Sequence, residues 1–111
     1  MALYVSTDNP QNLIDKIKDY INKGKIDTWS FDSDGDFTHC ADQWKNKAWF
    51  RPKIIDGHLV FGILGNTKVT MTKQLYGLYH GRFIEMLLTH FDMDLKSLEP
   101  TVMKSKYDSF S

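Results

Sequence analysis

The sequence is poor in cysteine, with Cys40 as the single example among 111 residues, so no disulfide can form within the chain. A lone cysteine is typical of a protein in a reducing compartment, and we therefore expect a cytoplasmic location. Long apolar runs are also missing, because no stretch approaches the ~18 residues that a membrane-spanning helix needs. Residues 1–10 contain no basic stretch followed by an apolar run, so we expect neither a secretory leader nor a membrane partner.

An excess of charge of either sign is missing as well. Lys and Arg number 14, Asp and Glu also number 14, and the formal net charge is zero. Non-specific binding of nucleic acid depends on a strong positive field, which this balance does not provide. The sequence also lacks a P-loop, a nucleophile elbow, a dinucleotide fingerprint and the His or Cys spacing of a common metal motif. These absences favour a binding protein over an enzyme, and they leave catalysis undecided.

The composition that remains is that of a small globular protein. Hydrophobic residues make up 41% of the chain, charged residues 25% and aromatic residues 14%. A chain of this length can build one ordinary core without staples, and its large aromatic side chains contribute much of the buried area. We therefore predict one domain over residues 1–111, with about 95–111 as a polar tail that either docks on the domain or frays.

Two segments have the spacing of apolar residues that predicts an amphipathic helix. Leu13 and Ile17 belong to such a series, which predicts a helix over roughly residues 9–23 with Asp8 as its N-cap. A second and longer series predicts a helix over roughly residues 72–92, with an apolar stripe on one side and charged residues on the other.

Between the two helices the apolar period changes to two, which predicts strands. A three-residue loop over residues 33–35 pairs Phe31 with Phe37 and Trp29 with His39, giving one aromatic face. The competing two-residue loop mixes aromatic and polar residues on each face. We therefore predict the three-residue loop for this first hairpin.

A second hairpin is the clearest local feature of the chain. Asp56-Gly57 fits a two-residue type I′ turn. Pairing outward from that turn sets Ile54 against Leu59 and Phe50 against Ile63, which makes an apolar face. The order helix, four strands, helix predicts an α+β fold: a four-stranded antiparallel meander with both helices on one face. A fifth strand at residues 2–6 is the variant that this pattern leaves open.

The other face of the second hairpin is the preferred candidate for function. If the helices cover the opposite side, this face looks outward and carries a mixture of aromatic, apolar and basic residues. Trp and Arg are the residue types most enriched at interaction hot spots. The alternative is that the tail or the segment at residues 2–6 covers this face. The candidate binding residues are Trp49, Arg51, Lys53, Ile55, His58 and Val60.

The turn of the first hairpin is the candidate metal site. Its register sets Asp32 opposite Asp36, with Asp34 at the tip, and facing carboxylates repel each other unless something positive lies between them. Ca²⁺ or Mg²⁺ would serve, because both prefer oxygen ligands. The alternative is a solvated turn, for which Asp and Gly are ordinary residues.

The histidines and the last helix offer a weaker signal for catalysis. We expect His39 to be a hydrogen-bonded histidine of the core, because no His spacing in the chain matches a metal motif. Acid and base groups on the last helix spread around its circumference, so that only some of them can share a pocket. These groups are Tyr76, His80, Arg82 and Glu85.

Three hypotheses about function follow. The first is a small soluble non-catalytic interaction protein, of inhibitor, immunity or regulatory-subunit type, which binds a partner protein through the exposed sheet face and needs no cofactor. The second is a divalent-metal-binding protein or hydrolase that holds Ca²⁺ or Mg²⁺ at Asp32, Asp34 and Asp36. The third is an accessory protein that binds single-stranded nucleic acid on the sheet face, where aromatic and basic residues can stack bases and hold phosphates.

Overall fold

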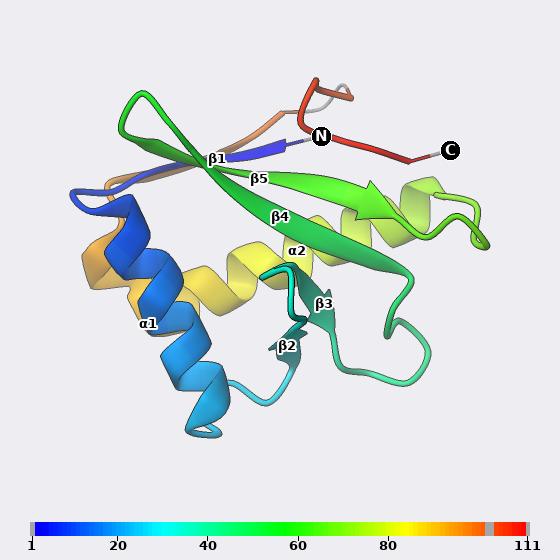
Figure 1. The fold of residues 1–111 in the computed structure, drawn as a ribbon, viewed down its shortest axis with the longest axis horizontal. Coiled ribbons are helices and arrows are strands. Elements are labelled where there is room, and N and C mark those ends of the chain that lie inside the picture. The colour runs from blue at the N-terminus through cyan, green and yellow to red at the C-terminus, as the bar shows by residue number, and fades with distance from the viewer. Residues whose placement is uncertain (1, 102–103, 111) are drawn as a thin grey trace.

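The computed structural model describes residues 2–101 and 104–110. Within them, the chain forms six strands and two α-helices, and four of the strands follow one another between the two helices. Figure 1 shows their arrangement. The elements are β1 (Ala2–Ser6), α1 (Pro10–Asn22), β2 (Trp29–Phe31), β3 (Phe37–His39), β4 (Ala48–Ile55), β5 (His58–Gly65), α2 (Lys73–Phe91), the 3-10 helix η1 (Asp92–Asp94) and β6 (Ser97–Pro100). Neither α-helix in the described segments has the length and apolar composition that crossing a membrane requires.

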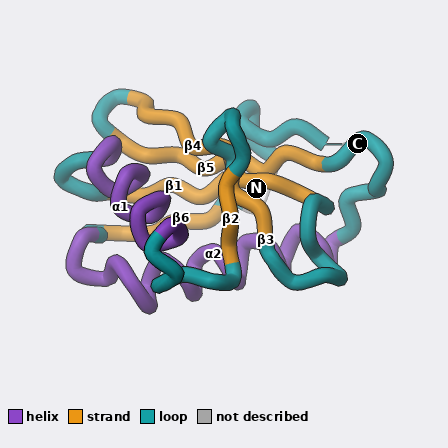
Figure 2. Tube along the Cα trace, turned by 60° about the horizontal axis from the view of Figure 1, so that its bottom comes forward, coloured by secondary structure: helices purple, strands orange, loops and turns teal. Residues whose placement is uncertain are grey.

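The strands form one antiparallel sheet with the order β2-β3-β4-β5-β1-β6. The predicted meander is β2 to β5, and the strand left open at residues 2–6 is β1, which pairs with β5. A sixth strand, β6, lies within the predicted tail and pairs with β1. Both helices lie on the same side of the sheet, so the prediction of an α+β fold is confirmed (Figures 1 and 2).

The registers of both predicted hairpins are confirmed. In the first, Trp29 pairs with His39 and Phe31 with Phe37, and Gly35 adopts a positive φ of 81°. The second hairpin sets Ile54 against Leu59, Pro52 against Phe61 and Phe50 against Ile63. Its turn residues Asp56 and Gly57 have φ values of 51° and 78°, as a type I′ turn requires.

The N-cap of α1 corrects one prediction. Asn9, not Asp8, caps the helix, and its side chain accepts a hydrogen bond from the Asn12 backbone N–H at 3.0 Å. The cause is Pro10, which occupies the first helical position and thereby makes the residue before it the cap. Asp8 instead forms an ion pair with Lys96 at 2.7 Å.

The core is a cluster of aromatic rings between α2 and the inner face of the sheet. Phe83 lies at its centre, with ring centroids 4.6 Å from Phe50, 4.8 Å from Phe61, 4.9 Å from Trp29 and 6.0 Å from Phe37. All five side chains are at most 2% exposed. Offset and edge-on arrangements at these distances add to the free energy gained from burial.

The C-terminal segment packs against the part of β5 that lies beyond the first residue of β1. Because β1 begins at Ala2, the end of β5 beyond Gly62 has no strand partner on that side. Asp108 fills this place by accepting a hydrogen bond from the Ile63 N–H at 2.9 Å, and Ser109 donates its N–H to the Ile63 carbonyl at 2.9 Å. Gly65 also donates its N–H to the Ser109 carbonyl, so the C-terminal segment supplies backbone partners to the end of β5.

Phe83→Ala tests the role of the aromatic cluster. We expect it to lower the free energy of unfolding by about 3–5 kcal/mol, because it empties the centre of a packed core. Urea denaturation followed by circular dichroism measures the change. Leu88→Ala is the matched control on the same helix, since Leu88 is 52% exposed and should change stability by about 0.5 kcal/mol or less. Equal losses in the two variants would contradict this assignment of the core.

Candidate functional site

The outer face of the sheet carries side chains in rows that run across the strands. One row joins β4, β5, β1 and β6: Lys53 pairs with Val60, Val60 with Tyr4, and Tyr4 with Glu99. Adjacent strands are about 4.8 Å apart, so the ends of this row are about 14 Å apart. Lys53 and Glu99 are exposed, and they place opposite charges at the two ends of the row.

The C-terminal segment crosses the middle of this face. A Cβ built on Gly62 would lie well inside contact distance of the Tyr107 carbonyl oxygen, so only glycine fits beneath the segment there. The Tyr107 ring also meets Tyr4 edge-on, with centroids 6.2 Å apart. Both alternatives for the outer face are therefore partly realised: the segment covers its centre, and the part near the β4–β5 turn stays open.

The six candidate binding residues differ in how much of each reaches the surface. Arg51, Lys53 and His58 are exposed, whereas Trp49 and Ile55 are half-buried. Val60 is 2% exposed, so it contributes almost no surface for a partner.

A shallow groove lies beside the exposed members of this set. It has a volume of about 320 Å³ and extends along β1, between the start of β5 and β6. His58 lines one side and Glu99 the other, with Tyr4 and Ser6 between them. The open part of the outer face is therefore hollowed.

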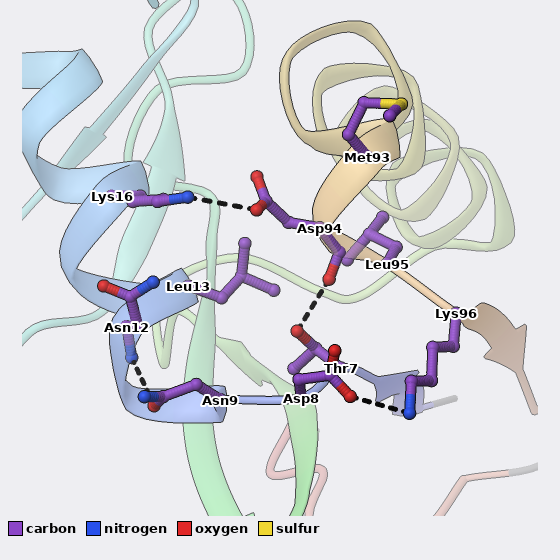
Figure 3. Close-up of a pocket in the computed structure, with 10 residues that line it drawn as sticks. All are labelled: Thr7, Asp8, Asn9, Asn12, Leu13, Lys16, Met93, Asp94, Leu95 and Lys96. Atoms are coloured by element: carbon purple, nitrogen blue, oxygen red, sulfur yellow. Dashed lines mark hydrogen bonds and ion pairs between the residues drawn. The ribbon is translucent and has the colours of Figure 1, made fainter.

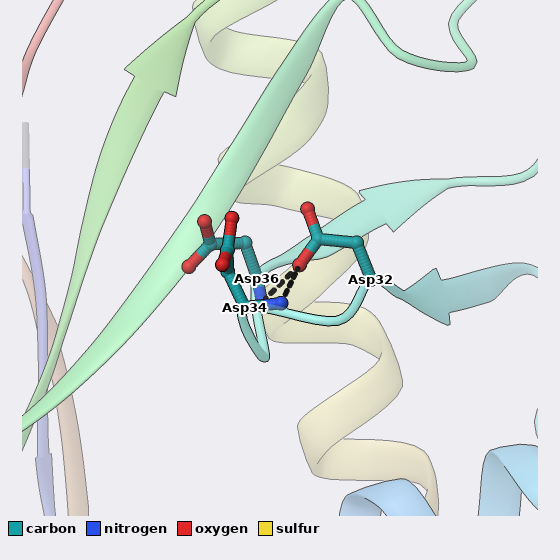
Figure 4. A group of neighbouring side chains, drawn as sticks. All are labelled: Asp32, Asp34 and Asp36. Carbon is teal, nitrogen blue, oxygen red and sulfur yellow. Dashed lines mark hydrogen bonds between the residues drawn. The ribbon is translucent and has the colours of Figure 1, made fainter.

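The acidic turn of the first hairpin gathers its carboxylates, as Figure 4 shows. Carboxylate oxygens of Asp32, Asp34 and Asp36 all lie within 4.8 Å of one another. Asp32 also organises the turn, because its Oδ1 accepts hydrogen bonds from the backbone N–H groups of Asp34 and Asp36, both at 3.0 Å. These oxygens are of the type that Ca²⁺ and Mg²⁺ prefer.

Arg51 provides the positive charge that the facing carboxylates require. Its Nε and Nη2 donate to the two oxygens of Asp36 at 3.0 and 2.7 Å, a bidentate ion pair. The hydrogen bond to Asp36 raises the pKa of the Arg51 guanidinium. The Asp36 side chain is 5% exposed and the Arg51 side chain 45%. A metal ion at the turn would have to compete with this guanidinium for Asp36.

A second site, which the sequence did not predict, surrounds His39. This cavity has a volume of about 300 Å³ and lies between the β2–β3 edge, the loop over residues 41–47 and α2. His39 is 9% exposed, and its Nδ1 accepts a hydrogen bond from the Ala41 N–H at 3.0 Å. Burial, together with the positive charge of Arg82, lowers the pKa of His39 below its ordinary value of 6.5.

The acid and base groups of the last helix separate into two places, as their spread around the helix predicted. Arg82 and Glu85 line the His39 cavity. His80 instead faces the core, where its ring meets Phe50 edge-on at 4.9 Å and its Nδ1 lies 2.8 Å from the Tyr76 carbonyl oxygen.

A third cavity, about 150 Å³ in volume, lies between the start of α1 and η1 (Figure 3). Its polar groups bond mainly to each other. Lys16 pairs with Asp94 at 3.0 Å, and the Thr7 hydroxyl donates to the Asp94 carbonyl at 2.7 Å. These contacts join the first helix to the end of the second, which is a structural role.

Comparison with protein-family models, with curated proteins and with solved structures finds no match to this chain. The function is therefore argued from the geometry of these sites.

Arg51→Met tests whether the ion pair with Asp36 is structural. We expect a loss of about 1–3 kcal/mol in the free energy of unfolding, because a carboxylate that is nearly excluded from water loses its charged partner. The double variant Arg51→Met/Asp36→Asn should recover at least half of the loss, since it removes the unpaired charge. Urea denaturation of both variants measures this. A double variant as unstable as Arg51→Met would refute the electrostatic explanation.

The lowered pKa of His39 predicts a pH dependence of stability. Below pH 6.5 the unfolded chain takes up a proton at this residue while the folded chain does not, so stability falls as the pH drops toward the folded pKa. The slope from this group is at most about 1.4 kcal/mol per pH unit. His39→Asn should show a shallower loss of stability than the wild type between about pH 6.5 and 5. Parallel curves for the two proteins would show that His39 does not contribute.

Proposed function

We propose that this chain is a small non-catalytic interaction protein, of inhibitor, immunity or regulatory-subunit type, that binds a partner protein through the open part of its outer sheet face. The observation that supports this proposal is that the part of the outer sheet face near the β4–β5 turn is open and hollowed. No helix in the described segments covers that face, and the groove along β1 lies next to exposed Lys53 and His58. The single cysteine supports a reducing, cytoplasm-like compartment for this function.

The charges on this face indicate what kind of partner it fits. Lys53 and His58 lie toward the β4–β5 turn, and Glu99 lies about 14 Å away on β6. A complementary segment presents a carboxylate to the first pair and a cation to Glu99. Tyr4 and Ile55 supply apolar contact on the same face. Such an arrangement of charges sets orientation and association rate more than affinity.

The other two hypotheses have less support. A metal site at Asp32, Asp34 and Asp36 conflicts with the bidentate hold of Arg51 on Asp36. Binding of single-stranded nucleic acid needs a continuous positive groove, whereas Glu99 lines the groove on this face.

The variant Lys53→Glu/His58→Glu tests the proposed surface. Wild-type and variant chains are immobilised and exposed to a nuclease-treated lysate of the native cells, and captured proteins are quantified by mass spectrometry. The captured partner is then purified, and its dissociation constant is measured by calorimetry. We expect binding to weaken at least tenfold in the variant, because the two groups that face the partner's carboxylate both become negative.

Lys73→Glu/Gln74→Glu is the control with matched new charges. Both positions are exposed at the start of α2, which lies behind the inner face of the sheet. This control should bind like the wild type. A partner whose affinity is the same for the wild type and for Lys53→Glu/His58→Glu, or capture of nothing specific, would overturn the proposal.

A further inference from the structure

The His39 cavity is held open by one tyrosine. The hydroxyl of Tyr79 donates to the Trp44 carbonyl oxygen and lies 3.1 Å from the Thr38 hydroxyl. These contacts fix the loop over residues 41–47 to α2 and to β3. The walls of the cavity are therefore set by hydrogen bonds between buried groups, and the cavity is a preformed feature of the fold.

His39 directs a hydrogen-bond donor into this cavity. Because its Nδ1 accepts from the Ala41 N–H, the ring proton of the neutral form is on Nε2. Nε2 has no hydrogen-bond partner among the described residues. Within those residues, every side-chain nitrogen or oxygen that is fully buried has a hydrogen-bond partner. Nε2 is therefore not fully buried, although His39 itself is 9% exposed, and His39 is one of the residues that line the cavity.

Arg82 provides a second donor, and it is loosely held. Its Nη1 lies 3.4 Å from Glu85 Oε2, which is long for a hydrogen bond, and the two side chains are 55% and 66% exposed. An exposed pair of this kind contributes little free energy, so the guanidinium can turn toward a ligand.

The remaining walls are aromatic and apolar. Trp44 comes from the loop and Leu78 from α2, and the nearly buried Trp29 lies behind them in the lining. Lys47 lies 5.6 Å from the Trp44 ring and adds a second positive charge beside the cavity. Within the lining Glu85 balances Arg82, so the preference for an anion over a cation comes from Lys47 beside the cavity and from the hydrogen-bond donors of His39 and Arg82.

We propose that this cavity binds a small aromatic carboxylate, with the carboxylate between Arg82 and His39 Nε2–H and the ring against Trp44 and Leu78. A volume of about 300 Å³ is at the lower end of those found for small-molecule sites, which fits a single-ring ligand. The site is separate from the outer sheet face, so this inference stands or fails independently of the proposed partner protein.

The test uses phenylacetate as the probe and neutral phenylacetamide as its matched control. Calorimetry and ¹⁵N-detected shifts of the His39 and Trp side-chain N–H groups follow binding to the full chain at pH 7.5. We expect saturable binding of phenylacetate with a dissociation constant of about 1 mM or tighter, and at least tenfold weaker binding of phenylacetamide. No saturable binding of phenylacetate, or equal binding of the two probes, overturns the proposal.

Two variants on exposed positions of α2 distinguish this site from other kinds of pocket. Arg82→Gln should weaken phenylacetate binding at least tenfold. Glu85→Gln should strengthen it about threefold, because it removes the carboxylate that competes for Arg82. A weaker affinity in Glu85→Gln would show that the site accepts a cationic or zwitterionic ligand and would refute the assignment.

A control and a core variant complete the set. Lys73→Gln removes one exposed positive charge at the start of α2, outside the cavity, and should leave the affinity unchanged. His39→Asn keeps an acceptor near the Ala41 N–H and removes the donor at Nε2, so it should weaken binding while the chain stays folded. If His39→Asn unfolds, the outcome rests on Arg82→Gln and Glu85→Gln, neither of which alters the core.

Discussion

The packing of Phe83 among the rings on the inner face of the sheet is the interaction on which the rest of the structure depends. It fixes α2 diagonally beneath β3, β4 and β5, with α1 beside it on the same side. Because both helices lie on one face, the other face has no helix over it. The middle of α2 lies beside the β2–β3 edge, where its side chains and the loop over residues 41–47 enclose a cavity. Both candidate sites are consequences of where this one helix packs.

The extent of the open outer face follows from a mismatch in strand length. β5 extends from His58 to Gly65, but β1 pairs with it only as far as Gly62. Buried backbone groups need partners, and the chain near Asp108 supplies them to the end of β5. The same segment then covers Gly62, which divides the outer face. The open part is therefore the end of the face near the β4–β5 turn.

Local patterns predicted most of the fold and only part of the candidate sites. Alternation and turn residues were enough for both hairpins, since register follows from the face that is buried and from the turn type. The strand β6 was not predicted, because Ser97–Pro100 has no apolar alternation and its strand conformation comes from pairing with β1. The cavity was not predicted either, since it joins His39 to Arg82, far apart in sequence, through the packing of α2. The ion pair between Arg51 and Asp36 was not predicted for a similar reason. Arg51 lies beside Asp36 because Phe37 pairs with Phe50, and this pairing joins two separate hairpins.

The chain has two arginines, and the burial of the carboxylate that each one contacts decides its role. One guanidinium stabilises the fold, and the other is available to a ligand. Arg51 is bound through two hydrogen bonds by a carboxylate that is 5% exposed, and releasing it would leave that carboxylate unpaired out of water. Arg82 faces a carboxylate that is 66% exposed at 3.4 Å, and water can replace that contact at little cost in free energy. Only the second guanidinium can exchange its partner for a ligand without destabilising the fold. The sequence gives both residues the same chemistry, and the exposure of their acidic partners gives them different roles.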